Sequence, residues 1–264
     1  MNLHPNLHHL LQSFAFVVGC CLGSFFNVII HRLPGKGSIV HPGSHCPRCG
    51  HPIAFYDNIP LLSFLVLGGR CRHCRERISL RYPLVEVLTG VLTLVLFRTY
   101  GPLPQFFIET LFVYLLILIA FIDLDTYLIP DVLSLSGIVA GLALSFFTPR
   151  LSWVDSLLGI LLGGGFLYLI AVGYQVLRHK EGMGGGDIKL LAMIGAFVGL
   201  PGVVFTVLAA SVVGTAAGVW VMVRSRQGLS AMLPFGPFLS LGAVCHLFWG
   251  QTFFSWYLER FTGG

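Results

Sequence analysis

Charged side chains are scarce in this sequence. Asp, Glu, Lys and Arg make up 10% of its 264 residues, whereas soluble globular domains carry about 25%. Hydrophobic residues make up 55%, and they are gathered in long runs. This composition excludes an ordinary soluble domain and indicates an all-α polytopic membrane protein.

Several common motifs are also absent. No basic region precedes the first apolar run and no Ala-x-Ala site ends it, so the N-terminus does not resemble a cleavable signal. The sequence has no His-Glu-x-x-His motif, and no Gly-x-Gly motif follows a strand pattern. Neither a zinc protease of that type nor a Rossmann-type cofactor domain is indicated.

The apolar runs are what the sequence has in abundance. A membrane span needs about 20 apolar residues, and we predict about eight transmembrane helices, of which the second and sixth are short. The eight predicted segments are residues 10–30, 84–97, 106–122, 132–147, 156–177, 188–200, 203–223 and 233–249.

The basic residues predict an orientation. With the N-terminus outside, 13 of the 16 Lys and Arg residues fall on one side of the membrane, and the positive-inside rule makes that side cytoplasmic. Both termini are then outside. The net charge of +5 reflects these loops and does not indicate nucleic-acid binding.

Two Cys-x-x-Cys pairs lie in the one sizeable polar segment, between the first two predicted spans. This spacing is typical of a four-thiolate zinc site, which is structural because no coordination position stays open. A reducing cytoplasmic location disfavours disulfides. His45, His51 and His73 are further possible ligands. The predicted metal ligands are Cys46, Cys49, Cys71 and Cys74.

Acidic residues gather at span edges on the predicted cytoplasmic face. Asp187 follows a glycine-rich stretch, residues 182–186, at the start of a predicted helix, where exposed N–H groups favour an anion. Asp123 ends a predicted helix, where the dipole disfavours one. We therefore hypothesise an ionised Asp187 and a protonated Asp123 that together activate water. Asp125 and Asp131 fit solvated or helix-start positions equally well.

These motifs together resemble the Gly-x-Gly-Asp membrane aspartic proteases, and more narrowly the bacterial type IV prepilin leader peptidase and N-methyltransferase family. The Gly-x-Gly-Asp motif is residues 184–187, and Asp123 stands eight residues before Asp131. The other matching stretches are residues 23–34, 56–60, 70–74, 78–83 and 234–238.

The resemblance implies two activities and their residues. Asp123 and Asp187 would be the catalytic pair that cuts a basic leader peptide after a glycine, at the cytoplasmic face of the bacterial inner membrane. The new N-terminal residue, usually Phe, would then be methylated with S-adenosylmethionine. The substrates would be prepilins and prepilin-like secretion proteins, or pseudopilins, whose apolar helix lies in membrane lipid.

The implied domains are a first transmembrane helix (1–31), a zinc-binding loop domain associated with methyl transfer (32–83) and a transmembrane peptidase domain (84–264). No methyl-donor residues can be assigned; Asn27, Asn58 and Glu86 are candidates for polar contacts, and Lys189 for contact with Asp187 or substrate. Two alternatives stay open at this point. They are a proton-coupled membrane transporter and a non-catalytic membrane scaffold with a zinc loop.

Overall fold

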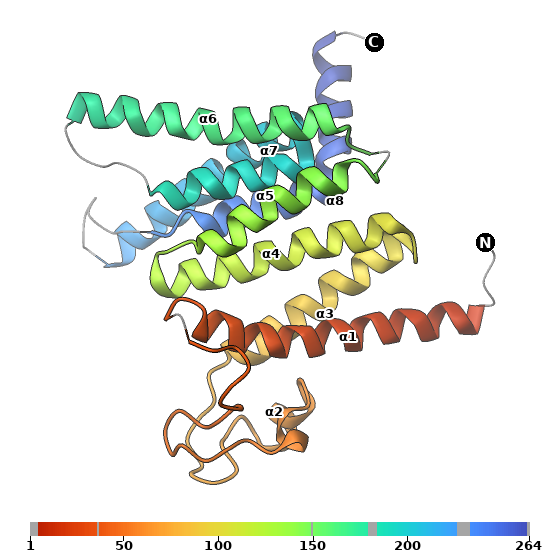
Figure 1. The fold of residues 1–264 in the computed structure, drawn as a ribbon, viewed down its shortest axis with the longest axis vertical. Helices are drawn as coiled ribbons and strands as arrows, with labels where there is room; N and C mark the ends of the chain where they lie inside the picture. The colour runs from red at the N-terminus through yellow and green to blue at the C-terminus, as the bar shows by residue number, and fades with distance from the viewer. Residues whose placement is uncertain (1–4, 36, 149, 179–183, 226–232, 263–264) are drawn as a thin grey trace. The chain divides into compact units, whose positions relative to one another are not determined.

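The chain folds as a set of long helices in a computed structural model that describes residues 5–35, 37–148, 150–178, 184–225 and 233–262. Among these residues there is no strand, only two isolated bridges. The predicted all-α class is therefore confirmed. The elements, of which Figure 1 labels the α-helices, are α1 (Pro5–Arg32), η1 (Phe55–Asn58), α2 (Leu62–Val66), α3 (Arg81–Tyr100), α4 (Pro104–Thr126), α5 (Asp131–Ser145), α6 (Trp153–Arg178), α7 (Gly185–Ser225) and α8 (Gly236–Thr262).

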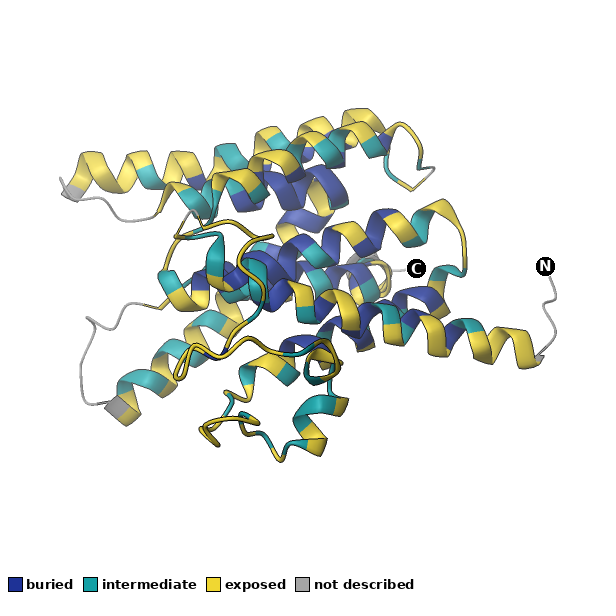
Figure 2. Ribbon diagram, turned by 60° about the horizontal axis from the view of Figure 1, so that its bottom comes forward, coloured by how far each residue is buried: buried dark blue, intermediate teal, exposed yellow. Residues whose placement is uncertain are grey.

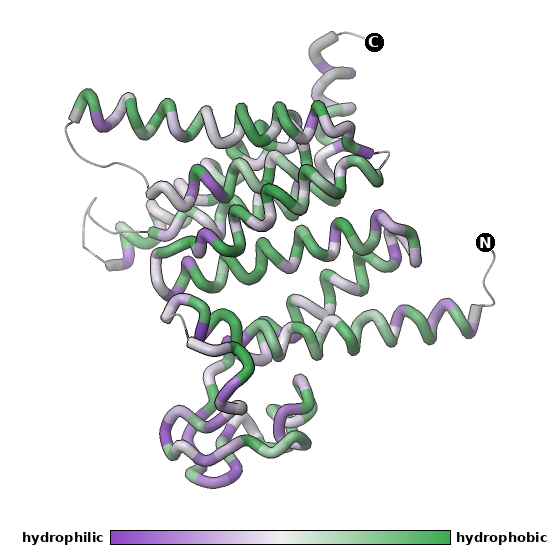
Figure 3. Tube along the Cα trace, viewed as in Figure 1, coloured by the Kyte–Doolittle hydropathy of each residue, from purple (hydrophilic) through white to green (hydrophobic). Residues whose placement is uncertain are grey.

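The helices follow the apolar runs of the sequence (Figure 3). Five of the described helices are long and apolar enough to cross a membrane, and α5 is a shorter apolar helix. Each of the eight predicted segments lies on a helix, and segments 188–200 and 203–223 both lie in α7. The last segment, 233–249, is the least accurate, because α8 continues to Thr262. The chain is a multi-pass membrane protein. Of the basic residues used to predict its orientation, Lys36, Lys180 and Arg226 lie outside the described residues.

Helix α7 is broken near its middle. At 1.5 Å per residue it would be about 60 Å long, twice the hydrocarbon thickness of about 30 Å. The break falls at Gly199, whose φ of 66° and ψ of −173° are not helical, and Pro201 follows without an N–H group. The break separates the two predicted spans and leaves a short first half that begins beside Asp187.

Two compact units make up the chain, residues 1–118 and 119–264. In the first unit α1 and α3 pack closely through small residues. A Cβ atom added at Gly19 would lie 2.8 Å from the Cα atom of Gly90, and one added at Gly23 would lie 2.8 Å from that of Glu86. Close contact between small residues is how helices pack in membranes. The loop with the cysteine pairs connects these two helices.

In the second unit the first half of α7 is enclosed by its neighbours. A Cβ atom added at Gly159 of α6 would overlap the carbonyl oxygen of Gly195 of α7. A Cβ atom added at Gly195 would likewise overlap the carbonyl oxygen of Gly159. The Ser156 hydroxyl donates to the carbonyl of Ala196 over 2.8 Å. Buried positions therefore gather along this half of α7, while the outer faces of the helices stay exposed (Figure 2). The enclosed segment fixes the helix start that carries Asp187.

Candidate functional site

Asp123 lies in the last turn of α4 and is only 4% exposed. Its carboxylate oxygen Oδ2 accepts a hydrogen bond of 3.0 Å from the backbone N–H of Gly236, the first residue of α8. The positive end of the α8 dipole and its free N–H groups stabilise a negative charge there. The buried carboxylate thus has a partner that was not apparent from its position at the end of α4.

The turn after Asp123 has a fixed shape. The N–H of Tyr127, a residue with φ of 55°, donates to the carbonyl of Asp123 over 2.9 Å. The Thr126 hydroxyl donates to the carbonyl of Ile122 and accepts from the N–H of Leu128. These bonds end α4 and direct the next residues back across its end. They set the position of Ile129.

Ile129 is wedged between two glycines from distant parts of the chain. A Cβ atom added at Gly186 would lie 2.9 Å from the Cβ atom of Ile129, and one added at Gly236 would lie 3.2 Å from its Cδ1 atom. The Cβ atom at Gly236 would also lie 2.6 Å from Oδ2 of Asp123. Only glycine fits at both positions, and Ile129 joins the Asp123 turn to the start of α7. The sequence alone indicates no role for Ile129, and it indicates Gly236 only as part of the matching stretch 234–238.

Asp187 stands in the first turn of α7, as predicted, with its N–H donating to the carbonyl of Gly184 over 3.2 Å. It is partly exposed. Gly186, which precedes Asp187, and Gly236, which binds Asp123, both lie against Ile129, so the structure places the two predicted residues in the same region of the second unit. A pair of carboxyl groups that differ in environment can serve as acid and base. Which of the two is protonated stays a hypothesis, because Gly236 also stabilises charge on Asp123.

The other residues of the acidic cluster have separate roles. Asp131 begins α5 after Pro130, and its carboxylate forms an ion pair of 2.6 Å with the Lys189 ammonium group. Lys189 therefore contacts Asp131, a partner that was not predicted, and its contact with Asp187 or substrate stays a prediction. Asp125 is exposed in the last turn of α4. Of the predicted glycine-rich stretch, Gly182 and Met183 lie outside the described residues.

The four predicted cysteines form a cluster in the loop of the first unit. One sulfur from each lies within 4.8 Å of the other three, and the sulfurs of Cys46 and Cys74 are 3.8 Å apart. A tetrahedral zinc with Zn–S bonds of about 2.3 Å would separate its sulfurs by about 3.8 Å. The donor set and spacing fit such an ion.

The two cysteine pairs sit in turns with the same hydrogen bonds. The N–H of Cys46 donates to the carbonyl of His51, and the N–H of Gly50 donates to that of Cys46. In the second pair Cys71 donates to Glu76, and Arg75 donates to Cys71. The residue after each second cysteine has a positive φ, 69° at Gly50 and 60° at Arg75. The loop thus contains two equivalent turns, and each turn directs its two cysteine sulfurs toward the same point.

The cysteine thiols of the cluster differ in their pKa. Backbone N–H groups of Cys49 and Arg48 lower the pKa of the Cys46 thiol to about 6. Despite the N–H of Glu76, desolvation and hydrogen bonds with the other cysteines raise the pKa of the Cys74 thiol to about 11. The thiolate is the form that binds a metal. The rings of His51 and His73 stack with centroids 3.8 Å apart. Among the described residues, the ligand cluster contains the four cysteines and no histidine.

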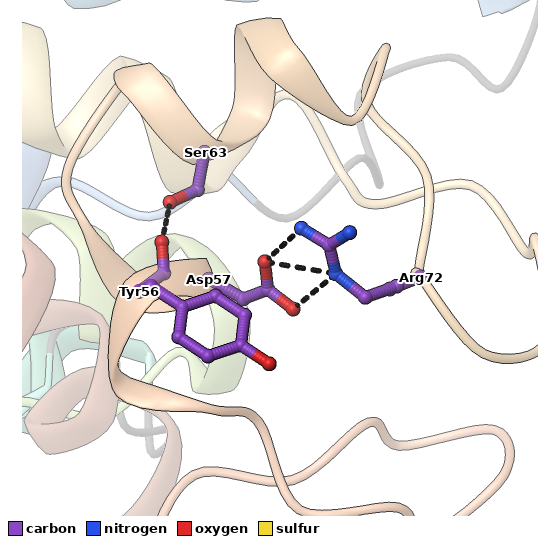
Figure 4. Close-up of polar contacts among 4 residues, drawn as sticks. All are labelled: Tyr56, Asp57, Ser63 and Arg72. Atoms are coloured by element: carbon purple, nitrogen blue, oxygen red, sulfur yellow. Dashed lines mark hydrogen bonds and ion pairs between the residues drawn. The ribbon is translucent and has the colours of Figure 1, made fainter.

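Arg72 lies between Cys71 and Cys74 in the sequence, and its side chain connects this cysteine pair to η1. It makes three hydrogen bonds of 2.6 to 3.1 Å with the carboxylate of Asp57 (Figure 4). These bonds hold the pKa of Asp57 below its usual value. The guanidinium carbon of Arg72 also lies 5.7 Å from the centre of the Tyr56 ring. The cysteine cluster and the segment around η1 are therefore one connected structure.

The three polar candidates for methyl-donor contact have different surroundings. The Asn27 amide donates to the carbonyl of Tyr82 over 3.1 Å, a bond between the end of α1 and the start of α3. Glu86 accepts from the N–H of Leu61 over 2.8 Å. Asn58 lines a pocket with a volume of about 360 Å³ in the same unit.

Comparisons with known proteins cover almost the whole chain. Residues 17–100 match the Bacterial Peptidase A24 N-terminal domain, and residues 110–219 match the Type IV leader peptidase family. Proteins named "Prepilin leader peptidase/N-methyltransferase" are similar. The one from Aeromonas hydrophila is 36% identical over 99% of this chain and 98% of its own length.

Two further relatives carry the same name. The one from Myxococcus xanthus is 43% identical over 83% of this chain and 65% of its own length. The one from Pseudomonas aeruginosa is 37% identical over 92% of each chain. No solved structure matches the chain.

Proposed function

Because the chain belongs to the type IV leader peptidase family, we propose that Asp123 and Asp187 are the catalytic pair of its peptidase. The enzyme cleaves the leader peptide of prepilins and N-methylates the product, as its relatives are named for doing. This membership decides against the transporter and scaffold alternatives. The observation that supports the assignment is that the turn after Asp123, the start of α7 next to Asp187 and the start of α8 all pack against Ile129.

The pair can divide peptide hydrolysis between an acid and a base. The ionised carboxylate takes a proton from water while the water oxygen bonds to the peptide carbonyl carbon. The protonated carboxyl group donates its proton to the carbonyl oxygen. When the C–N bond breaks, the leaving nitrogen takes a proton from the carboxyl group that accepted one from water, and the hydroxyl formed from the carbonyl returns its proton to the other carboxylate. The α8 N-terminus next to Asp123 stabilises whichever step places a negative charge on that residue.

The cut is expected after a glycine, at the cytoplasmic face of the bacterial inner membrane. The excess of Lys and Arg on the predicted cytoplasmic side supports this location. A prepilin or pseudopilin with a basic leader and an apolar helix in the lipid would present its scissile bond at that face.

The loop cysteines would hold a structural zinc ion. Cys46, Cys49, Cys71 and Cys74 supply four sulfurs with the required spacing, so no position is open for catalysis by the metal. S-Adenosylmethionine, when bound, supplies the methyl group for the new N-terminus. The metal would fix the loop, and methyl transfer would depend on it.

The assignment of the carboxyl pair is tested with Asp123→Asn and Asp187→Asn. Either change should slow cleavage of a prepilin reporter by about 10²- to 10⁴-fold, the range that general acid–base catalysis contributes. Asp131→Asn is the matched control, because it removes an exposed carboxylate of the same cluster and should change cleavage by less than about threefold. Full cleavage by both Asp123→Asn and Asp187→Asn would refute the pair.

A further inference from the structure

The pocket that Asn58 lines in the first unit has no ligand assigned to it above. It lies between the C-terminal half of α1 and two parts of the loop, residues 39–44 and 58–60, and its volume is about 360 Å³. Phe25 and Val28 of α1 and Ile39 of the loop contribute apolar walls, whereas Ser24 and Asn58 contribute polar groups. Small-molecule sites are typically concave, largely apolar and of about 300–1,000 Å³.

We propose that this pocket binds the S-adenosylmethionine used for N-methylation. The inference rests on the proposed function, because that function requires a methyl donor. A donor of this class has a flat aromatic base, a polar ribose and an amino-acid end with a carboxylate. The apolar walls suit the base, and Ser24 and Asn58 suit the hydroxyl groups.

Arg32 gives the pocket a fixed positive charge. Its Nη1 atom donates to the carbonyl of Ser38 over 3.0 Å, and its Nη2 atom donates to the carbonyl of Gly43 over 3.2 Å. A guanidinium group has five N–H donors, so these two bonds hold the side chain without using all of them. The charge of Arg32, which lines the pocket, is complementary to the carboxylate of the donor.

The walls of the pocket are held from both sides. Glu86 of α3 is hydrogen-bonded to Ser24 on α1 and to the N–H of Leu61 next to Pro60. On the other side, Asn58 directly follows Asp57, which Arg72 holds from within the second cysteine pair (Figure 4). The cysteine cluster thus positions one wall, which gives the cysteine loop a specific role in methyl transfer.

Two measurements on the full-length protein, purified with its zinc, test the inference. S-Adenosylhomocysteine, the stable product form of the donor, should bind in calorimetry. It should also protect Cys21, an exposed thiol that lines the pocket, from alkylation read out by peptide mass spectrometry.

A matched pair of substitutions locates the binding site. Ile39 and Ile53 are both 39% exposed in the loop, but only Ile39 is among the lining residues of this pocket. Ile39→Trp should fill the pocket and weaken binding by about tenfold or more, while Ile53→Trp should change it by less than about twofold. Zinc content and size-exclusion elution show that each variant is folded.

The outcomes separate the two levels of the proposal. If the wild-type protein binds the probe but Ile39→Trp binds equally well and Cys21 is not protected, the pocket assignment is wrong and the methyltransferase stands. If the wild-type protein binds no probe, the pocket assignment falls together with the methyl-transfer half of the proposed function. Neither result affects the carboxyl pair, which is tested by cleavage alone.

Discussion

The cysteine loop and the aspartate site are held in shape by opposite means. The loop buries few side chains and depends on directed bonds, namely four converging sulfurs, repeated turn hydrogen bonds and the Arg72–Asp57 pair. The aspartate site depends on missing side chains, because glycines let α6, α7, α8 and Ile129 approach each other. Loss of a metal ligand should therefore unfold the loop, whereas an added methyl group at a glycine should disrupt the aspartate site.

The largest effect is expected from removing the metal that the four cysteines would hold. Cys71→Ser or chelation should unfold residues 44–78, since apparent zinc-binding free energies in small domains are about 10–16 kcal/mol. Amide hydrogen exchange should rise throughout this segment, with methyl transfer lost. Residues 190–196 of α7 are the internal control and should keep their protection. Unchanged exchange in the loop would mean that the turns fold without a metal.

The next largest effect is expected from a single methyl group at the contact between α6 and α7. Gly159→Ala places a Cβ atom on the Gly195 carbonyl, and such overpacking should lower the free energy of unfolding by about 3 kcal/mol. Gly165→Ala on the same helix meets nothing within 4 Å and is the control. Thermal unfolding in detergent compares them. Equal stability of the two variants would contradict the close contact.

A third comparison uses neighbouring glycines of the Gly-x-Gly-Asp motif. Gly186→Ala should push Ile129 away and misplace Asp187, lowering the rate of prepilin cleavage by about 10²-fold. Gly185→Ala adds its methyl group to open space and should leave the rate within about twofold. If both variants cleave equally well, Ile129 does not position the carboxyl pair.

The smallest effect is expected within the loop itself. Arg75 occupies the positive φ that Gly50 occupies in the equivalent turn, and this conformation costs a non-glycine residue about 1 kcal/mol or more. Arg75→Gly should therefore stabilise the zinc-bound loop slightly, whereas Gly50→Ala should destabilise it by a similar amount. Chelator titration followed by hydrogen exchange would measure both. A loop weakened by Arg75→Gly would show that the arginine side chain matters more than its backbone.

Local patterns in the sequence predicted much of this structure. Apolar runs predicted the helices, the cysteine spacing predicted the cluster, and the glycines before Asp187 predicted a helix start. These features depend on neighbouring residues, so one chain segment contains the information. The turns that hold the two cysteine pairs likewise depend on hydrogen bonds between residues close together in the sequence.

The contacts that build the aspartate site were not predictable in this way. Gly236 is 113 residues from Asp123, and Lys189 is 58 residues from its partner Asp131. Nothing near Ile129 in the sequence indicates that it fills the space beside two glycines. Such contacts depend on how helices pack, and many packings are compatible with the same apolar runs.

The glycine contacts between α6 and α7 also determine how far along α6 Asp187 lies from the end of that helix. Gly159 lies against Gly195 and Gly163 against Leu191, so by the same antiparallel register Asp187 is level with Leu167. Helix α6 continues from there to Arg178, about 16 Å further at 1.5 Å per residue. A leader that lay along this part of α6 would run beside three turns of the helix, a length that about five extended residues span. The register between α6 and α7 would then set a lower limit on the length of such a leader peptide.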